Sequence, residues 1–328
     1  MRNINKIYNK DCIEYMKTLP DECVDLIIAD PPYFSTNIQE VGDNQWRTES
    51  QYIKWYLDVL KECFRILKDS GSIYLFHNDH SIMADVLYEC KNSIGFKIRN
   101  HVTWNKFPTH NNFSRIIKMY GKNRNFGKTF SEDIWFLTKQ EDFFETPFSK
   151  IMKDKMIELN LTQSDISKLQ LSKSGKTTGW VSNKLKGTQI PTREQWLKIC
   201  NLFNIEDNYD YLLKEFNENR YRFNQSFIDF KGKTIEEQKE LLKPYSTIWE
   251  YKKDEDIYKK HMTPKPVKMI DNIINISSNE NELVFIPFAG SGSEIISCIK
   301  NNRNYIATEL NNDYIEEIIK PRIKDINK

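Results

Sequence analysis

Hydrophobic and polar positions along the chain follow two different periodicities. Short apolar runs predict strands over residues 4–8, 24–29, 72–76, 98–104, 134–137, 283–286 and 304–308. Apolar positions at helical spacing predict helices over 13–19, 52–67, 81–93, 266–276, 294–301 and 312–323, and Asp69-Ser70-Gly71 is predicted to end the second of these. Strands and helices of this size in alternation predict a doubly wound, mostly parallel α/β sheet.

A long basic segment, residues 105–131, separates two of the predicted strands. It holds six Lys or Arg residues and no acid, with Phe and Tyr interleaved. This composition suits phosphate contacts combined with base stacking, although a solvated loop is an open alternative. The predicted DNA contacts in this segment are Lys106, Arg115, Lys118, Lys122 and Arg124.

A second interruption, residues 149–204, reads as helical throughout. It carries ten Lys or Arg residues against four acids. Residues 161–166 and 180–187 resemble helices two and three of a Cro/repressor-type helix-turn-helix, but the connection between them, 170–177, is longer than usual. If the second of these helices enters the major groove, we expect Ser182 and Asn183 to contact base edges and Lys184 and Lys186 to contact phosphates. A plain helical insertion is the alternative.

Composition narrows the class of protein. The 328 residues are 39% hydrophobic and include no apolar run near the ~20 residues of a membrane span. The start of the chain is no signal peptide, and the six cysteines form no Cys-x-x-Cys pair. We therefore expect a cytoplasmic protein with reduced thiols, no disulfide framework and no metal site. Because the net charge is only +2, any nucleic-acid surface must be local.

The tetrapeptide Asp30-Pro31-Pro32-Tyr33 directly follows the predicted strand 24–29. Each proline fixes φ and lacks a backbone donor, so the pair ends the strand and stiffens the turn after it. A carboxylate, free carbonyls and an aromatic ring are thus presented at the C-terminal edge of a strand, where open α/β sheets bind ligands. A strand that merely ends in a Pro-Pro turn is the alternative.

A glycine-containing turn, 287–293, follows the strand 283–286 and opens a helix. Glycine lets a backbone approach a ligand closely, and a helix N-terminus favours an anionic group. Ile295 stands where dinucleotide-binding turns have a third glycine, which argues against NAD. Glu309 ends the next strand, and an acid at that place typically holds ribose hydroxyls.

Three segments together resemble one enzyme family. Residues 30–33 resemble motif IV of the DNA amino-methyltransferases, and 287–293 with Glu309 resemble motif I and the ribose-binding acid of class I methyltransferases. The segment His261-Met262-Thr263-Pro264-Lys265-Pro266 resembles motif X, which lies against the methionine end of the cofactor. Because the Asp-Pro-Pro-Tyr segment comes first and the glycine turn last, the chain is identified as similar to the β group of DPPY type.

The resemblance implies methyl transfer from S-adenosyl-L-methionine to adenine N6 of a base flipped out of double-stranded DNA. Asp30 and the Pro31 carbonyl would accept hydrogen bonds from the two N–H groups of the amine. Pro32 would complete the turn, and Tyr33 would stack on the base. Asp11-Cys12 matches the position that contacts the adenine of the cofactor. The implied cofactor contacts are Asp11, Cys12, Asp30, Lys265, Phe288, Ala289, Gly290, Ser291, Gly292, Ser293 and Glu309.

The same resemblance implies the fold. We expect a class I methyltransferase, with a Rossmann-like seven-stranded sheet in circularly permuted motif order and strands 98–104 and 134–137 as its terminal antiparallel pair. The expected organisation is a target-amine half of the catalytic domain (1–148), a target recognition insert (149–204), a return segment (205–260, with a helix near 234–242) and a cofactor half of the catalytic domain (261–328). Ile286 stands where the family usually has Asp, so one polar cofactor contact is missing.

Several alternatives accompany this hypothesis. N4-cytosine methylation uses the same logic, but that class more often has Ser at the first position, so Asp30 favours adenine. RNA methylation and a DNA-binding regulator with an inactive methyltransferase body also stay open, whereas C5-cytosine methylation is excluded because no proline precedes a cysteine. The expected partners are double-stranded DNA, a second copy of the chain, and a separate cognate restriction endonuclease, with no membrane.

Overall fold

The computed structural model describes residues 4–34, 46–106, 131–139, 146–170, 179–185, 187, 189–217, 233–252 and 264–326. The chain divides into two compact units. One unit joins residues 1–141 to 242–328, and the other comprises residues 142–241. In the described residues, no helix combines the length and apolar character needed to cross a membrane.

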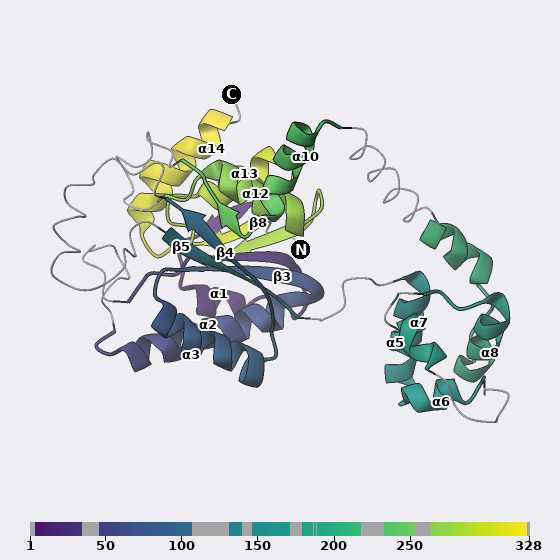
Figure 1. The fold of residues 1–328 in the computed structure, drawn as a ribbon. Helices are drawn as coiled ribbons and strands as arrows, with labels where there is room; N and C mark the ends of the chain where they lie inside the picture. Colours follow the sequence, from purple (N-terminus) through teal and green to yellow (C-terminus); the bar gives the residue numbers. More distant parts are fainter. Residues whose placement is uncertain are drawn as a thin grey trace. The chain divides into compact units, whose positions relative to one another are not determined.

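The first unit is built on one eight-stranded mixed sheet in the order β1-β8-β7-β2-β3-β5-β4-β6 (Figure 1). Its core is parallel, and β5 runs antiparallel to both β3 and β4. The strands are β1 (Lys6–Tyr8), β2 (Val24–Ala29), β3 (Leu67–His77), β4 (Lys97–Asn105), β5 (Ser131–Thr138), β6 (Ile248–Trp249), β7 (Leu283–Ile286) and β8 (Asn304–Thr308).

The sheet differs from the sequence prediction in its number of strands. Seven strands were predicted, and the structure has an eighth, β6. This strand pairs in parallel with β4 and is the edge strand on that side of the sheet. The predicted antiparallel pair therefore exists but is not terminal. Two residues of strand carry no periodicity, so only the pairing with β4 defines β6.

Strand β3 also begins earlier than predicted. The chain passes from helix α2 (Glu49–Ile66) straight into the strand at Leu67, so residues 69–71 lie inside β3 rather than ending a helix. The pairing of Val24 with Leu67 and of Leu26 with Ser72 leaves extra residues on β3, which form a bulge. Gly71 fits this bulge because a Cβ there would stand 2.9 Å from the Asp25 carbonyl oxygen.

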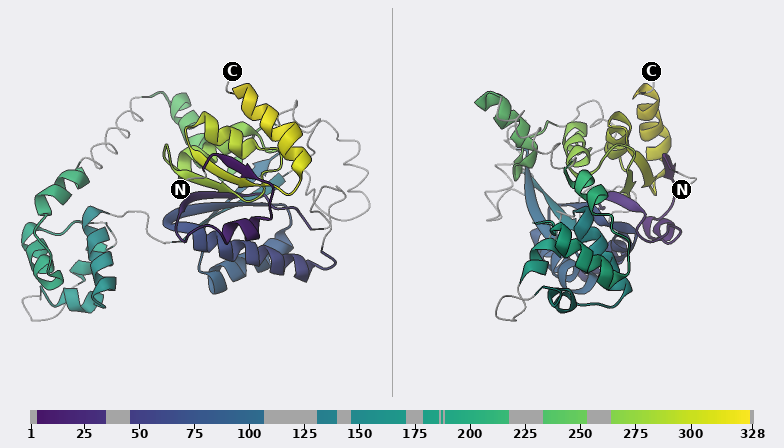
Figure 2. Two further views of the ribbon diagram at one scale, coloured as in Figure 1. Left: turned by 180° about the vertical axis from the view of Figure 1, so that it is seen from behind. Right: turned by 90° about the vertical axis from the view of Figure 1, so that its right-hand side faces the viewer.

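Helices cover both faces of the sheet, giving three layers (Figures 1 and 2). One face carries α1 (Cys12–Met16), α2 and α3 (His80–Glu89), which continues in a π-helical turn over Cys90–Ile94. The other carries α12 (Val267–Ser277), α13 (Ser293–Lys300) and a π-helical segment, Tyr314–Ile319, that leads into α14 (Lys320–Ile326).

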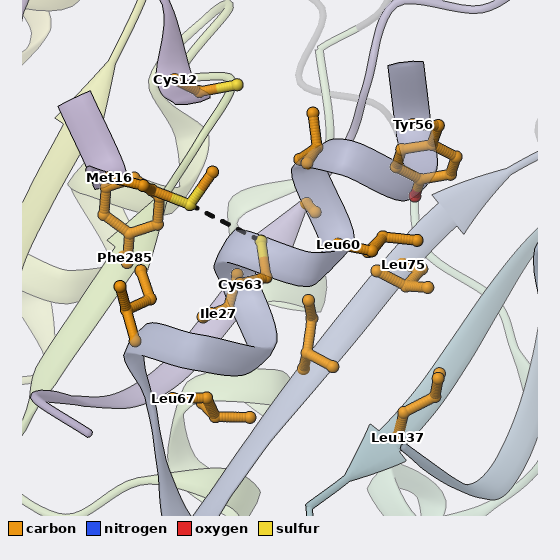
Figure 3. Close-up of a cluster of buried hydrophobic side chains, with 14 of the residues drawn as sticks. Cys12, Met16, Ile27, Tyr56, Leu60, Cys63, Leu67, Leu75, Leu137 and Phe285 are labelled. Carbon is orange, nitrogen blue, oxygen red and sulfur yellow. Dashed lines mark hydrogen bonds between the residues drawn. The ribbon is translucent and has the colours of Figure 1, made fainter. Parts of the chain in front are cut away.

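Each face has its own hydrophobic core, since alternate residues of a strand point to opposite sides. In β2, Ile27 packs toward α1 and α2, whereas Leu26 and Ile28 belong to the cluster that includes α12 and α13. Figure 3 shows the first cluster, in which the Cys63 thiol donates to the Met16 sulfur at 3.9 Å. Burial on both faces explains why the central strands read as continuous apolar runs.

The second unit is helical, as the sequence predicts for this stretch. It contains α5 (Pro147–Glu158), α6 (Gln163–Ser167), α7 (Trp180–Leu185) and α8 (Arg193–Phe203), and most of α10 (Ile235–Leu242). Capping boxes begin α5, α6 and α8, at Thr146, Thr162 and Thr192. A separate core holds α5, α6, α7 and α8 together, formed by Phe148, Met152, Ile166, Val181, Trp196, Ile199, Cys200, Phe203 and Leu212.

Candidate active site

Four neighbouring parallel strands, β8, β7, β2 and β3, end at the same edge of the sheet. Glu309 follows β8, the glycine turn 287–293 follows β7, and Asp30 follows β2. His77 is the last residue of β3. The two segments with the strongest sequence signals therefore leave adjacent strands side by side, which is where open α/β sheets bind ligands.

A buried ionic network surrounds Asp30. The Lys265 ammonium lies 2.5 Å from Asp30 Oδ2 and 2.9 Å from Glu132 Oε1. The Tyr33 hydroxyl lies 3.1 Å from Asp30 Oδ1 and 2.9 Å from Glu132 Oε1, so its one hydrogen is shared between two carboxylates. Lys106 supplies the second cation, bonded to Glu132 Oε2. Two carboxylates are thus balanced by two ammonium groups.

Glu132 and Lys106 belong to this network in ways the sequence did not predict. Glu132, near the start of β5, is only 4% exposed and was not among the predicted site residues. Lys106 was predicted to contact phosphates, but its ammonium is held by Glu132 and lies 4.4 Å from the centre of the Trp104 ring. A buried carboxylate needs a cation, and Lys106 directly follows β4, the strand next to β5.

Burial and charge act on these groups in opposite directions. Burial raises the pKa of Asp30, and the Lys265 ammonium partly offsets it. Burial also raises the pKa of Glu132, but Lys106 and Lys265 outweigh it, so that pKa lies well below its ordinary value. The Tyr33 pKa is raised by burial and by the carboxylates of Asp30 and Glu132. Tyr33 therefore remains a protonated donor, and Asp30 is a better proton acceptor than an exposed aspartate.

His77 and a group of aromatic rings border the network. The Tyr33 ring centre lies 4.8 Å from that of His77, which is itself 1% exposed. His77 Nδ1 accepts a hydrogen bond from the Asp79 backbone at 2.9 Å, so in the neutral ring Nε2 carries the proton and faces the Tyr52 hydroxyl at 3.1 Å. The His77 ring therefore packs against the Tyr33 ring beside the network.

The glycine turn is shaped by its backbone angles. Gly290 and Gly292 have φ of 47° and 76°, in the left-handed region. A Cβ on Gly292 would stand 3.0 Å from Ile319 Cγ2. The Gly290 N–H donates to Glu309 Oε2 at 2.7 Å, and the Asn311 N–H donates to Oε1 at 2.8 Å. Since each carboxylate oxygen has two lone pairs, Glu309 can anchor the turn and still accept ribose hydroxyls. The turn therefore fits a nucleoside-bearing cofactor.

Replacing Gly292 by Val should weaken binding of S-adenosyl-L-methionine at least about tenfold, because an L-residue at this φ is strained by ~1–3 kcal/mol and its side chain meets Ile319. Equilibrium dialysis measures the affinity. Gly179→Val is the matched control, because a Cβ there meets nothing within 4 Å. Unchanged affinity in Gly292→Val would make the turn structural only.

The other predicted cofactor residues lie at or near the same edge. Asp11 caps α1, and its Oδ1 accepts the N–H groups of Ile13 and Glu14 at 2.9 and 3.1 Å. Cys12 is buried, which raises the pKa of its thiol. The Phe288 ring contacts Trp55, while Ala289, Ser291 and Ser293 are buried within the turn.

The predicted DNA-binding residues are only partly described. On α7, Asn183 is exposed and Ser182 is half-buried. Lys184, predicted to contact phosphate, is 8% exposed and donates to Gln189 Oε1 at 2.9 Å, because the helix packs that side inward. The remaining predicted positions lie outside the described residues: Arg115, Lys118, Lys122, Arg124 and Lys186.

Comparison with known proteins agrees with this geometry. A family model described as DNA methylase (N6_N4_Mtase) matches residues 24–320, which include both halves of the site. The chain belongs to the DNA methylase family. Membership extends across the helical unit as well as the sheet, and it places Asp30 and the glycine turn in one enzyme family.

Two relatives of this family member span nearly the whole chain. The type II methyltransferase M.BamHI of Bacillus amyloliquefaciens is 23% identical over 99% of this chain, which spans 58% of that protein. The DNA adenine methyltransferase YhdJ of Escherichia coli K12 is 24% identical over 94% of this chain and 80% of its own length.

Two solved structures share the fold. TTHA0409 of Thermus thermophilus, assigned as a DNA modification methylase and solved with S-adenosyl-L-methionine, has a TM-score of 0.53 at 18% identity, covering 97% of this chain and 94% of that one. The cytosine-N4-specific PvuII DNA methyltransferase has a TM-score of 0.51 at 17% identity, covering 99% and 91%. At these identities the likeness establishes the class I methyltransferase fold.

Proposed function

We propose that this DNA methylase transfers a methyl group from S-adenosyl-L-methionine to the N6 amine of adenine in double-stranded DNA. The observation that carries the proposal is the placement of Asp30 and Tyr33 after β2, beside the glycine turn of the neighbouring strand β7. An acceptor for an amine and a site for a nucleoside cofactor then share one edge of the sheet.

The exocyclic amine of adenine is a poor nucleophile because its lone pair is delocalised into the ring. Asp30 and the Pro31 carbonyl accept hydrogen bonds from its two N–H groups. These hydrogen bonds localise the lone pair on the nitrogen and orient it. When bound, S-adenosyl-L-methionine supplies an electrophilic methyl group on a sulfonium. The amine loses one proton in the reaction, and Asp30, whose pKa burial raises, is the carboxylate that takes it.

The ionic network keeps Asp30 in one orientation for this role. Lys265 holds Oδ2 at 2.5 Å and the Tyr33 hydroxyl lies 3.1 Å from Oδ1. Glu132 in turn contacts both Lys265 and Tyr33. The ring of Tyr33, supported by His77, provides the stacking surface for the flipped base.

Adenine is favoured over cytosine by two lines of support. Asp occupies the first position of the tetrapeptide, where N4-cytosine enzymes more often have Ser. YhdJ, a DNA adenine methyltransferase, is a relative over most of its own length and most of this chain. Cytosine N4 remains the competing target because the PvuII enzyme, which is cytosine-N4-specific, has the same fold.

Reaction of the protein with mixed DNA sequences and methyl-labelled S-adenosyl-L-methionine, followed by digestion to nucleosides, tests the proposal. We expect label in N6-methyldeoxyadenosine. Label in N4-methyldeoxycytidine would change the target base, and label in RNA alone would change the substrate. Cofactor and DNA binding without any transfer would indicate a regulator with an inactive methyltransferase body.

We propose further that the helical unit selects the target sequence, with Ser182 and Asn183 at base edges. Replacing both residues by Ala should lower discrimination between target and near-target DNA by about tenfold or more. Binding to unrelated DNA should change little, because its affinity comes from phosphate contacts. Competition binding measures both, and Ser164→Ala on α6 is the control. If discrimination were unaltered, the residues that read the target sequence would have to lie elsewhere in the chain.

The proposed setting is a bacterial type of modification system in the cytoplasm. A homodimer and a separately acting cognate restriction endonuclease are the proposed partners, and the similarity to type II methyltransferases supports this context. Sedimentation of the purified protein across a range of concentrations tests the dimer.

A further inference from the structure

A second buried carboxyl group, Glu294, lies close to the site and is not used in the mechanism above. Glu294 is in the first turn of α13, two residues after Gly292, and is 4% exposed. The glycine turn that precedes it follows β7, the strand next to the one that ends at Asp30. Glu294 therefore lies in the helix that begins at the active-site edge of the sheet.

Among the described residues, no lysine or arginine lies within ion-pair distance of the buried Glu294 carboxylate, in contrast to those of Asp30 and Glu132. Asp30 and Glu132 are each in contact with the Lys265 ammonium, and Glu132 also holds Lys106. A buried carboxylate without a cation is costly, and such groups concentrate at sites that bind a complementary charge.

The cofactor of the proposed function carries the complementary charge. Its amino-acid end is a zwitterion with one carboxylate and one α-ammonium. The N-terminus of α13, an eight-residue helix, favours the carboxylate. We propose that Glu294 binds the α-ammonium of the methionine end of S-adenosyl-L-methionine, an inference that rests on the proposed function.

Two further features agree with this assignment. The strand before the glycine turn ends in Ile286, so it offers no side-chain acceptor to that ammonium, and Glu294 lies on the other side of the turn. Burial raises the pKa of Glu294 to about 7, with Asp30 raising it and Lys265 and Arg322 lowering it. An ammonium beside the carboxyl would return its pKa toward the ordinary value.

The test measures the affinity of two ligands by calorimetry at pH 8. One is S-adenosylhomocysteine, and the other is its desamino analogue, in which hydrogen replaces the α-ammonium. We expect the wild-type protein to prefer the first by about 30-fold or more, the range for a buried charge pair. Glu294→Gln should bind both ligands within about threefold of each other, because it loses the carboxylate but keeps the side-chain shape.

The control variant is Glu317→Gln, whose side chain is exposed on the segment before α14 and which should keep the wild-type preference. A wild-type protein that binds both ligands equally would overturn the assignment without any variant. A Glu294→Gln protein that keeps the preference would also overturn it. If the wild-type protein binds neither ligand, the proposed function itself fails, and this result is distinct from the other two.

Discussion

Asp30→Ala should transfer methyl groups at least about 1,000-fold more slowly than the wild-type protein, within the range that a positioned general base contributes. The variant removes the acceptor that orients the target amine and takes its proton. Lys265 keeps Glu132 as a partner at 2.9 Å, so the substitution leaves no unpaired lysine. Single-turnover transfer of labelled methyl groups to DNA measures the rate, and equilibrium dialysis measures any loss of cofactor affinity separately.

Asp21→Ala is the matched control for this experiment. Asp21 forms an ion pair with Arg65 at the surface, where its side chain is 73% exposed, and such pairs contribute ~0–1 kcal/mol to stability. Transfer by Asp30→Ala within tenfold of the wild-type rate, about 1.4 kcal/mol of barrier, would remove Asp30 from the chemistry. Tyr33→Phe then isolates the hydroxyl that faces the two carboxylates.

Glu132→Gln should lower the free energy of unfolding by about 3–5 kcal/mol at pH 7, the usual cost of removing one partner from a buried ion pair. The substitution leaves Asp30 as the carboxylate partner of Lys265 and removes the carboxylate that Lys106 contacts. Urea unfolding followed by circular dichroism measures the difference. Glu316→Gln, which breaks an exposed pair with Lys320, should change it by less than about 1 kcal/mol.

A second substitution sharpens this test. Adding Lys106→Gln to Glu132→Gln removes one charge of each sign and should recover part of the lost stability, since neighbouring groups are not additive. The pKa of Glu132 is depressed in the folded protein, so its contribution is present above the unfolded-state value near ~4.3 and is lost as the pH falls below it. A loss under about 1 kcal/mol at pH 7 would contradict the network.

Much of the fold could be predicted because its local signals agree with its long-range packing. Strands β2 and β7 are buried on both faces, so their continuous apolar runs could be identified in the sequence. The tetrapeptide at 30–33 indicates where β2 ends. Family membership confirms the enzyme class predicted from these segments. Sequence reasoning failed where pairing alone decides, as in the two-residue strand β6 and the early start of β3.

The sequence predicted which backbone segments form the candidate site, but it did not predict the ionic contacts between their side chains. Asp30 and the glycine turn carry recognisable spacing, whereas Glu132 is one of two adjacent acids, with Asp133, at the start of a strand. Two adjacent acids at the start of a buried strand were a usable signal. The partner of Lys106 depends on the pairing of β4 with β5, and the position of Glu294 depends on how α13 packs. No sequence pattern predicts either of these.

The division of the sheet between two distant stretches of chain has a consequence for biosynthesis. Asp30, Lys106 and Glu132 all precede the helical unit, whereas Lys265 and strands β7 and β8 follow it. Strand β2 acquires one of its two neighbours only when β7 has emerged from the ribosome. Before Lys265 has been synthesised, the nascent chain holds two acids against one lysine, and the glycine turn is still missing. The ionic network and the glycine turn are therefore complete only after residues 265–309 have been synthesised, so we expect a product truncated before them to lack methyl transfer.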